Sequence, residues 1–312
     1  GAIALLVLVY PVLVDGLPVY QRLGALVLLA AIGASAWNIV GGYAGQVSVG
    51  HAVFFGFGAY ASVVVYTHLE WPPIAGAPLG MALSVLLAAV IGVPTLRLSG
   101  HYFSMATIAV GELVRVLSST SEFLGGAQGL GGPAMPRTVF DLSFISAMPF
   151  YYIFLAVLVF LLGLTWWIEN SRMGFYLRAI KDSERAARSL GVSAGKYKLY
   201  AYMLSGAFAA LAGSLYLCMF NFVDPNSGFD ILISVKMVVM AALGGAGHLF
   251  GPLVGALILV PLEELSNSYL GSKGAGLTFI VYGAIIVVIA SIVIATFALR
   301  LLSSLFQRQE VV

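Results

Sequence analysis

Charged side chains are scarce in this sequence. Asp, Glu, Lys and Arg together make up 9% of its 312 residues, whereas they supply roughly a quarter of a typical soluble domain. Hydrophobic residues account for 61% of the chain, and its mean hydropathy is +1.01. Such a chain cannot cover its own surface with polar groups. A soluble enzyme or a nucleic-acid-binding protein is therefore excluded, and a lipid bilayer is the expected solvent.

Cysteine and the common catalytic motifs are also missing. The single Cys218 lies inside an expected helix, which excludes a disulfide framework and a cysteine metal site. No set of His, Cys, Asp and Glu has metal-ligand spacing, and there is no Gly-x-Ser-x-Gly elbow. The stretch "GVSAGKY" resembles a phosphate loop, but Gly191 and Gly195 are one residue too close, and Tyr197 replaces the Ser or Thr that would hold magnesium. We therefore expect no bound metal or cofactor and no catalytic residue, so the chain is predicted not to be an enzyme.

Long apolar runs are what the sequence has in place of charge. Runs such as 152–167 and 277–299 are continuous, unlike the alternating strands of a membrane barrel. We predict an all-α polytopic membrane protein with about eight to ten transmembrane helices in a single domain over 1–312. The expected crossings are 2–14, 23–40, 52–69, 79–96, 102–121, 150–168, 199–222, 231–246, 248–265 and 276–305. The first is too short to cross and no Met precedes it, so we expect a shortened first helix, with a signal-peptide remnant as the alternative.

Lys and Arg are distributed unequally between the two sides that these crossings predict. If 169–198 is cytoplasmic, the loop at Arg97 and the C-terminal tail are cytoplasmic as well. The loops of the opposite side then carry only Arg22, Arg137 and Lys273. This asymmetry follows the positive-inside rule, and it predicts that both termini lie inside.

The segment 169–198 is the one strongly polar part of the chain, with ten of its 28 charged residues. Asp182 or Ser183 can cap a short helix, Glu184 favours its first turn, and Gly191 ends it. On this helix the apolar side is expected to carry Ala186, Ala187 and Leu190, and Glu184 can pair with Arg188. Two interpretations stay open: a loop that merely follows the charge rule, or a helix that docks on a cytosolic partner.

Glycine gathers in two clusters, 41–58 and 242–259. Each opens with a Gly-Gly pair, contains a histidine (His51 or His248) and leads into an apolar helix. Glycine-interrupted apolar segments in both halves of a chain indicate an internally repeated transporter with its pathway at the repeat interface. We expect discontinuous, Gly-rich helices that unwind or cross closely where a solute passes. Close helix packing by itself is the alternative explanation.

Several polar residues are expected at membrane depth. Glu112 and Arg115 are three residues apart and can pair on one helix face, either as a structural ion pair or as a solute contact. Neutral hydrogen bonds to a zwitterion could come from Asn38, Gln46, Ser48, Thr107 and Gln128. The residues that we predict to line the translocation pathway are Gly42, Gly45, Gln46, Ser48, Gly50, His51, Glu112, Gly245, Gly247 and Gly251.

Five segments occur in an order that resembles one known family. They read "GYAGQVSVGHAVFFGFGAY", "LRLSGHYFSMATIAVGELVR", "GGAQGLGGPAMP", "GFYLRAIKDSERAARSLGVSAGKYKLYAYMLSGAFAALAGSLY" and "MVVMAALGGAGHLFGPLVGALIL". Over about 25–265 the chain is similar to the permeases of branched-chain amino acid ABC importers, most closely to the second, longer permease of the pair. His248 departs from the family's pattern, which often has a small residue there.

The resemblance implies a function and a set of partners. It implies a multi-pass permease subunit of the inner (plasma) membrane that carries branched-chain or related amino acids. The implied partners are a second homologous permease, an extracytoplasmic solute-binding protein and two cytosolic ATPases, which hold the ATP and magnesium. The family's ATPase-contact loop corresponds to Arg178, Asp182, Ser183, Glu184, Ala186, Ala187, Arg188, Leu190 and Gly191. Alternatives are a permease for urea or short amides, and a secondary transporter of a small polar solute driven by an ion gradient.

Overall fold

A computed structural model describes residues 16–98, 100–133 and 146–270 without interruption, together with the isolated positions 9–11, 13, 14, 142, 144, 283, 284, 287 and 291. The chain divides into two compact units, Gly1–Leu257 and Ile258–Val312. All the interactions discussed below lie within the first unit.

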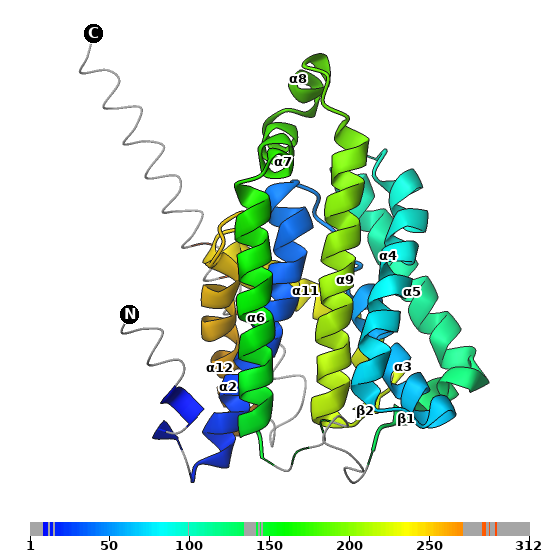
Figure 1. The fold of residues 1–312 in the computed structure, drawn as a ribbon, viewed down its shortest axis with the longest axis vertical. Coiled ribbons are helices and arrows are strands. Elements are labelled where there is room, and N and C mark those ends of the chain that lie inside the picture. Colours follow the sequence, from blue (N-terminus) through cyan, green and yellow to red (C-terminus); the bar gives the residue numbers. More distant parts are fainter. Residues whose placement is uncertain are drawn as a thin grey trace. The chain divides into compact units, whose positions relative to one another are not determined.

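The described part is built almost entirely of helices (Figure 1). The α-helices are α2 (Pro18–Asn38), α3 (Ala52–Leu69), α4 (Gly76–Thr95), α5 (His101–Thr120), α6 (Met148–Glu169), α7 (Arg172–Asp182), α8 (Glu184–Ser189), α9 (Ala194–Phe220), α10 (Pro225–Phe229), α11 (Ile231–Gly244) and α12 (Gly251–Leu270). The shorter elements are the π-helical turn η1 (Ile39–Tyr43), the 3-10 turns η2 (Pro73–Ala75), η3 (Glu122–Leu124) and η4 (Gly126–Gln128), and the antiparallel strands β1 (Leu130–Gly131) and β2 (Phe222–Val223).

Six helical segments of the described residues are long and apolar enough to cross a membrane. They are Pro18–Tyr43, Ala52–Leu69, Pro73–Thr95, Met148–Glu169, Ala194–Phe220 and Pro225–Gly244. These confirm the predicted all-α polytopic class. The expected crossings at 102–121 and 248–265 form α5 and α12, which are not among the six, and 276–305 and most of 2–14 lie outside the described residues.

Helix α9 is the centre of the first unit, where it packs against α2, α3 and α4 (Figure 1). Glycines let these backbones touch. A Cβ added at Gly58 of α3 would lie 1.8 Å from the carbonyl oxygen of Ala210, and one at Gly213 of α9 would lie 1.8 Å from that of Phe55. No side chain fits at such distances, so α3 and α9 cross at backbone contact, as small residues allow in membrane helices.

The two glycine clusters interrupt helices, as predicted. Helix α2 ends in the π-helical turn η1, 44–50 is not helical, and α3 begins at Ala52. In the second cluster α11 ends at Gly244, and Gly245 and Gly247 have φ values of +103° and +89°, which suit glycine because it lacks a Cβ. Helix α12 then begins at Gly251, so Pro252 lies in its first turn. Proline is tolerated there, because a residue in the first turn of a helix loses no intrahelical hydrogen bond.

Candidate functional site

The two interruptions, far apart in the sequence, meet in the structure. The Asn38 side chain accepts a hydrogen bond from the backbone N–H of Gly247 at 2.8 Å and donates one to the carbonyl oxygen of His248 at 3.1 Å. A Cβ added at Gly42 would lie 2.5 Å from the nitrogen of Gly247. We call this contact of Asn38 and Gly42 with Gly247 and His248 the glycine junction. Asn38 is buried, and its amide satisfies the N–H of Gly247 and adds a second donor to the carbonyl oxygen of His248, which also accepts from the N–H of Gly251.

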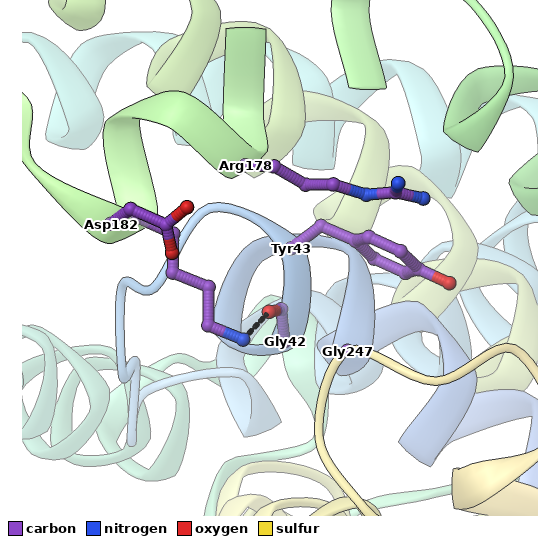
Figure 2. A pocket seen from close by; sticks show the side chains of 6 residues that line it. Gly42, Tyr43, Arg178, Asp182 and Gly247 are labelled. Atoms are coloured by element: carbon purple, nitrogen blue, oxygen red, sulfur yellow. Dashed lines mark hydrogen bonds between the residues drawn. The ribbon is translucent and has the colours of Figure 1, made fainter. Parts of the chain in front are cut away.

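Helix α7 of the polar segment reaches the glycine junction through Lys181. Its Nζ donates a hydrogen bond to the carbonyl oxygen of Gly42 at 2.7 Å, drawn as the dashed line in Figure 2. Added Cβ atoms at Gly247 and Gly45 would lie 3.0 Å from Nζ and 3.1 Å from Cγ of Lys181. One lysine therefore contacts both glycine clusters. A cavity of about 230 Å³ adjoins it, lined by Gly42, Tyr43, Arg178, Lys181, Asp182 and Gly247 (Figure 2).

A second set of polar contacts joins α7 and the end of α6 to η1. Arg178 forms an ion pair with Glu169, the last residue of α6, and the Tyr43 hydroxyl donates to the same carboxylate at 3.4 Å. Glu169 thus joins α6, α7 and η1.

Helix α8 has the ends that the sequence predicts. The Ser183 hydroxyl accepts a hydrogen bond from the N–H of Ala186 at 3.4 Å, so Ser183 rather than Asp182 is the N-cap. Gly191 has φ +83°, and hydrogen bonds from Gly191 to Arg188 and from the following residue to Ala187 close the helix in a Schellman arrangement.

Glu184 connects α8 to the start of α9. Its carboxylate pairs with Arg188, as predicted, and also with Lys198, a buried lysine. Burial opposes ionisation of this carboxyl, but the hydrogen bond and charge of Lys198, together with Arg188, lower the pKa of Glu184 below its ordinary value. Glu184 therefore stays ionised at neutral pH, and it gives the buried Lys198 an oppositely charged partner.

The apolar side of α8 differs from the expectation. Ala187 is buried against Ile180 and Ala194, whereas Ala186 and Leu190 face outward and Leu190 is 84% exposed. The prediction that Ala187 shares an outer apolar face with Ala186 and Leu190 is wrong. Ala186 points about 100° away from Ala187, and Leu190 follows the last residue of α8, so α7 and α9 bury Ala187 and leave the other two exposed.

Several predicted pathway residues are packed inside the fold. Both ring nitrogens of His51 are hydrogen-bonded, Nδ1 with the Ser48 hydroxyl at 2.9 Å and Nε2 with that of Ser205 at 2.7 Å. The Ser205 hydroxyl donates its hydrogen to the carbonyl oxygen of Ala36 at 2.6 Å, so it accepts from Nε2–H of His51, and Nδ1 accepts from Ser48. In this conformation His51 and Ser48 hold the start of α3, while Gln46 is partly exposed.

The remaining predicted pathway residues fall into three places. A Cβ at Gly50 would lie 2.2 Å from the carbonyl oxygen of Thr107, so Gly50 is a close contact with α5. Gly245 and Gly251 belong to the second interruption, where a Cβ at Gly251 would lie 2.4 Å from the oxygen of Gly245. Glu112 is apart from the glycine junction.

The Glu112–Arg115 ion pair is present on α5. Arg115 also donates to the side-chain oxygen of Asn226 in α10 at 3.0 Å, and the two charged side chains keep 56% and 31% of their exposure. The pair therefore lies on the outer side of this chain rather than in its core.

Sequence reasoning missed Lys181 and Tyr43, and it named Asn38 only as one of several hydrogen-bonding residues. A weak signal was present: Arg178 and Lys181 are three residues apart, which places two cations on one side of a short helix. Nothing in the sequence indicates that they meet Gly42, because that contact depends on the tertiary fold.

Comparison with known proteins establishes the family. A family model described as the permease component of the branched-chain amino acid transport system matches residues 21–290. The chain belongs to the branched-chain amino acid transport permease family. This membership confirms the resemblance noted in the sequence, and it supports the predicted place of the protein as a multi-pass protein of the inner membrane.

Individual members of this permease family are distant relatives. The high-affinity branched-chain amino acid transport system permease protein LivM of Escherichia coli is 28% identical over 256 residues, which cover 74% of this chain and 60% of LivM. BraD of Pseudomonas aeruginosa is 26% identical over 277 residues, 84% of this chain and 87% of BraD. The probable LivH of Methanocaldococcus jannaschii is 29% identical over 261 residues, 78% of this chain and 82% of LivH.

These matches leave the permease type open. The matched part of the chain thus spans about 60% of the length of LivM, and relatives of both the LivM and the LivH type match. Assignment to the longer type therefore stays a prediction. No solved structure matches the chain.

Proposed function

We propose that this chain is a permease subunit of an ATP-driven importer and that it moves branched-chain or related amino acids across the inner membrane. The family membership supports this proposal, because the relatives are named as branched-chain amino acid transport permeases. The observation that carries the proposal further is the contact of α7 with both interrupted helices through Lys181. A polar cytoplasmic segment that reaches the breaks of two membrane helices suits a transporter driven from the cytoplasm.

The proposal includes partners. A second, homologous permease would complete the pathway, and an extracytoplasmic binding protein would deliver the solute. Two cytosolic ATPases would supply ATP hydrolysis and bind the cytoplasmic loops of the two permeases, which in this chain means the outer face of α8. Exposed residues on α8 and directly after it favour a protein partner there: Ala186, Arg188 and Leu190. ATP and magnesium belong to the partner ATPases in this scheme, and the chain itself has no enzymatic role. The ion-gradient mechanism is not favoured, because it gives α8 no task.

Reconstitution tests this function. The chain is co-expressed with the permease, ATPases and binding protein encoded beside it, and the purified complex is placed in proteoliposomes. We expect leucine uptake that requires ATP inside and binding protein outside, and that a proton or sodium ionophore does not reduce. Uptake that continues without ATP and stops with an ionophore would contradict the proposal. Competition by valine and isoleucine, compared with urea and acetamide, identifies the solute class.

A further inference from the structure

We propose that Lys181 is the positioning residue through which α7 and α8 control the two interrupted membrane helices. The inference rests on the proposed function in one respect: an ATPase must move α8. It goes beyond that function by naming the route from the docking helix to the pathway.

The route begins where α8 packs on α7. Ala187 of α8 is buried against Ile180 of α7, so a displacement of α8 is transmitted to α7 by direct contact. The ion pair of Glu184 with Lys198 ties α8 to α9 and so restrains rotation of α8 about its own axis. Packed side chains transmit displacement because protein interiors are close-packed and hardly compressible.

The route continues at the residue that follows Ile180. Lys181 turns toward the membrane helices, and its Nζ donates to the carbonyl oxygen of Gly42, inside the π-helical turn η1. Its aliphatic part lies against Gly45, and its Nζ is close to Gly247. Since π-helical turns frequently mark functional sites in helices, the position of this hydrogen bond is informative. Shifting Lys181 changes the restraint on both interruptions at once.

The adjoining cavity gives this lysine room to move. It does not resemble a preformed ligand site, since Arg178 is engaged with Glu169, and Lys181 with Gly42. Asp182 lines the same cavity, and its carboxylate has no hydrogen-bond partner among the described residues (Figure 2). A Lys181 released from Gly42 would find in Asp182 a charged acceptor at the same cavity. In the proposed route the Lys181 ammonium has two positions, on Gly42 and on Asp182, and the structure shows the one on Gly42.

Lys181→Met tests the route. Methionine keeps a similar aliphatic length but loses the charge and the donor. In the reconstituted complex we expect the ATPases to bind at wild-type amounts and to hydrolyse ATP, while leucine uptake per ATP falls about tenfold, a typical size for a coupling between sites. The matched control is Lys196→Met, at an exposed lysine in the first turn of α9, which should transport like wild type. A wild-type ratio in Lys181→Met would overturn the inference.

A labelling measurement on the assembled complex covers the case in which the solute is not leucine. Gln46→Cys places a thiol in the partly exposed break between α2 and α3, and the native Cys218 is buried. With Lys181 present, the labelling rate of the full complex should change several-fold between its nucleotide-free and ATP-bound forms. With Lys181→Met that change should disappear. A nucleotide-dependent rate that survives the substitution would overturn the role of Lys181. Failure of wild-type uptake would instead contradict the proposed function.

Discussion

The first glycine cluster contains two kinds of glycine. Gly42, Gly45 and Gly50 lie where the chain is π-helical or unwound, whereas Gly56 and Gly58 lie inside α3, a regular helix. The two glycines of α3 serve packing. A Cβ added at Gly56 would collide with Phe229, and one at Gly58 with the backbone of α9. Glycines in one short stretch therefore do two jobs. Gly45, at φ +68°, permits the unwound backbone, whereas Gly42 and Gly50, like the two glycines of α3, also allow close contacts.

The largest effect is expected where glycine packs helix on helix. Gly58→Leu inserts a side chain where even a Cβ would lie 1.8 Å from a carbonyl oxygen, so α3 and α9 must separate. Overpacking costs typically about 1–3 kcal/mol, and a rigid backbone neighbour places this change at or above the upper end. Thermal unfolding in detergent and membrane yield should both fall sharply. Gly163→Leu is the control, because Gly163 of α6 is exposed with open space around it. Equal stability of the two variants would contradict this distinction.

Substitutions in the interruptions should instead abolish transport in a protein that still inserts. Gly251→Leu pushes against the carbonyl oxygen of Gly245, and Gly45→Leu is strained at φ +68° and displaces Lys181. We expect no measurable uptake from either at matched membrane expression. Alanine should be milder at both sites, although at Gly45 it still adopts an unfavourable left-handed conformation that costs about 1 kcal/mol. If the leucine variants transport like wild type, these glycines do not belong to the translocation pathway.

Two positions on α8 test the division between its inner and outer faces. Leu190→Glu changes an exposed residue, so the protein should remain folded while binding less ATPase and transporting several-fold less. Ala187→Glu buries a charge against Ile180 and should disorder α8 itself. Limited proteolysis within 183–192 distinguishes them, with faster cleavage expected only for Ala187→Glu. Rapid cleavage of Leu190→Glu would show that the assignment of faces is wrong.

The smallest effect is expected for the Glu112–Arg115 pair. The two side chains pair with each other at the surface of this chain, and ion pairs at protein surfaces contribute little. Glu112→Gln and Arg115→Gln should each lower uptake modestly, and the double variant should not be worse than either. A double-mutant cycle of uptake at equal expression measures the interaction. Strictly additive losses would show that the two side chains act independently.

Much of the fold and part of the site could be predicted. The crossings at 52–69 and 150–168 agree with α3 and α6 to within a few residues, because long apolar runs between polar loops are local signals. The ends of α8 were predictable for the same reason, since caps depend on neighbouring residues. The inward direction of Ala187 was not, because an alanine is apolar whether a neighbouring helix covers it or a partner does.

Sequence by itself determined that this protein is helical, spans a membrane and breaks its helices at two glycine clusters, because hydropathy, charge and glycine content act over short stretches of chain. Tertiary structure alone decided that the two helix interruptions meet, that Asn38 binds a backbone N–H 209 residues away, and that Lys181 donates a hydrogen bond to Gly42. Contacts of that kind follow from how α2, α7 and α11 are placed, and placement is set by the summed packing of the whole unit rather than by any local pattern.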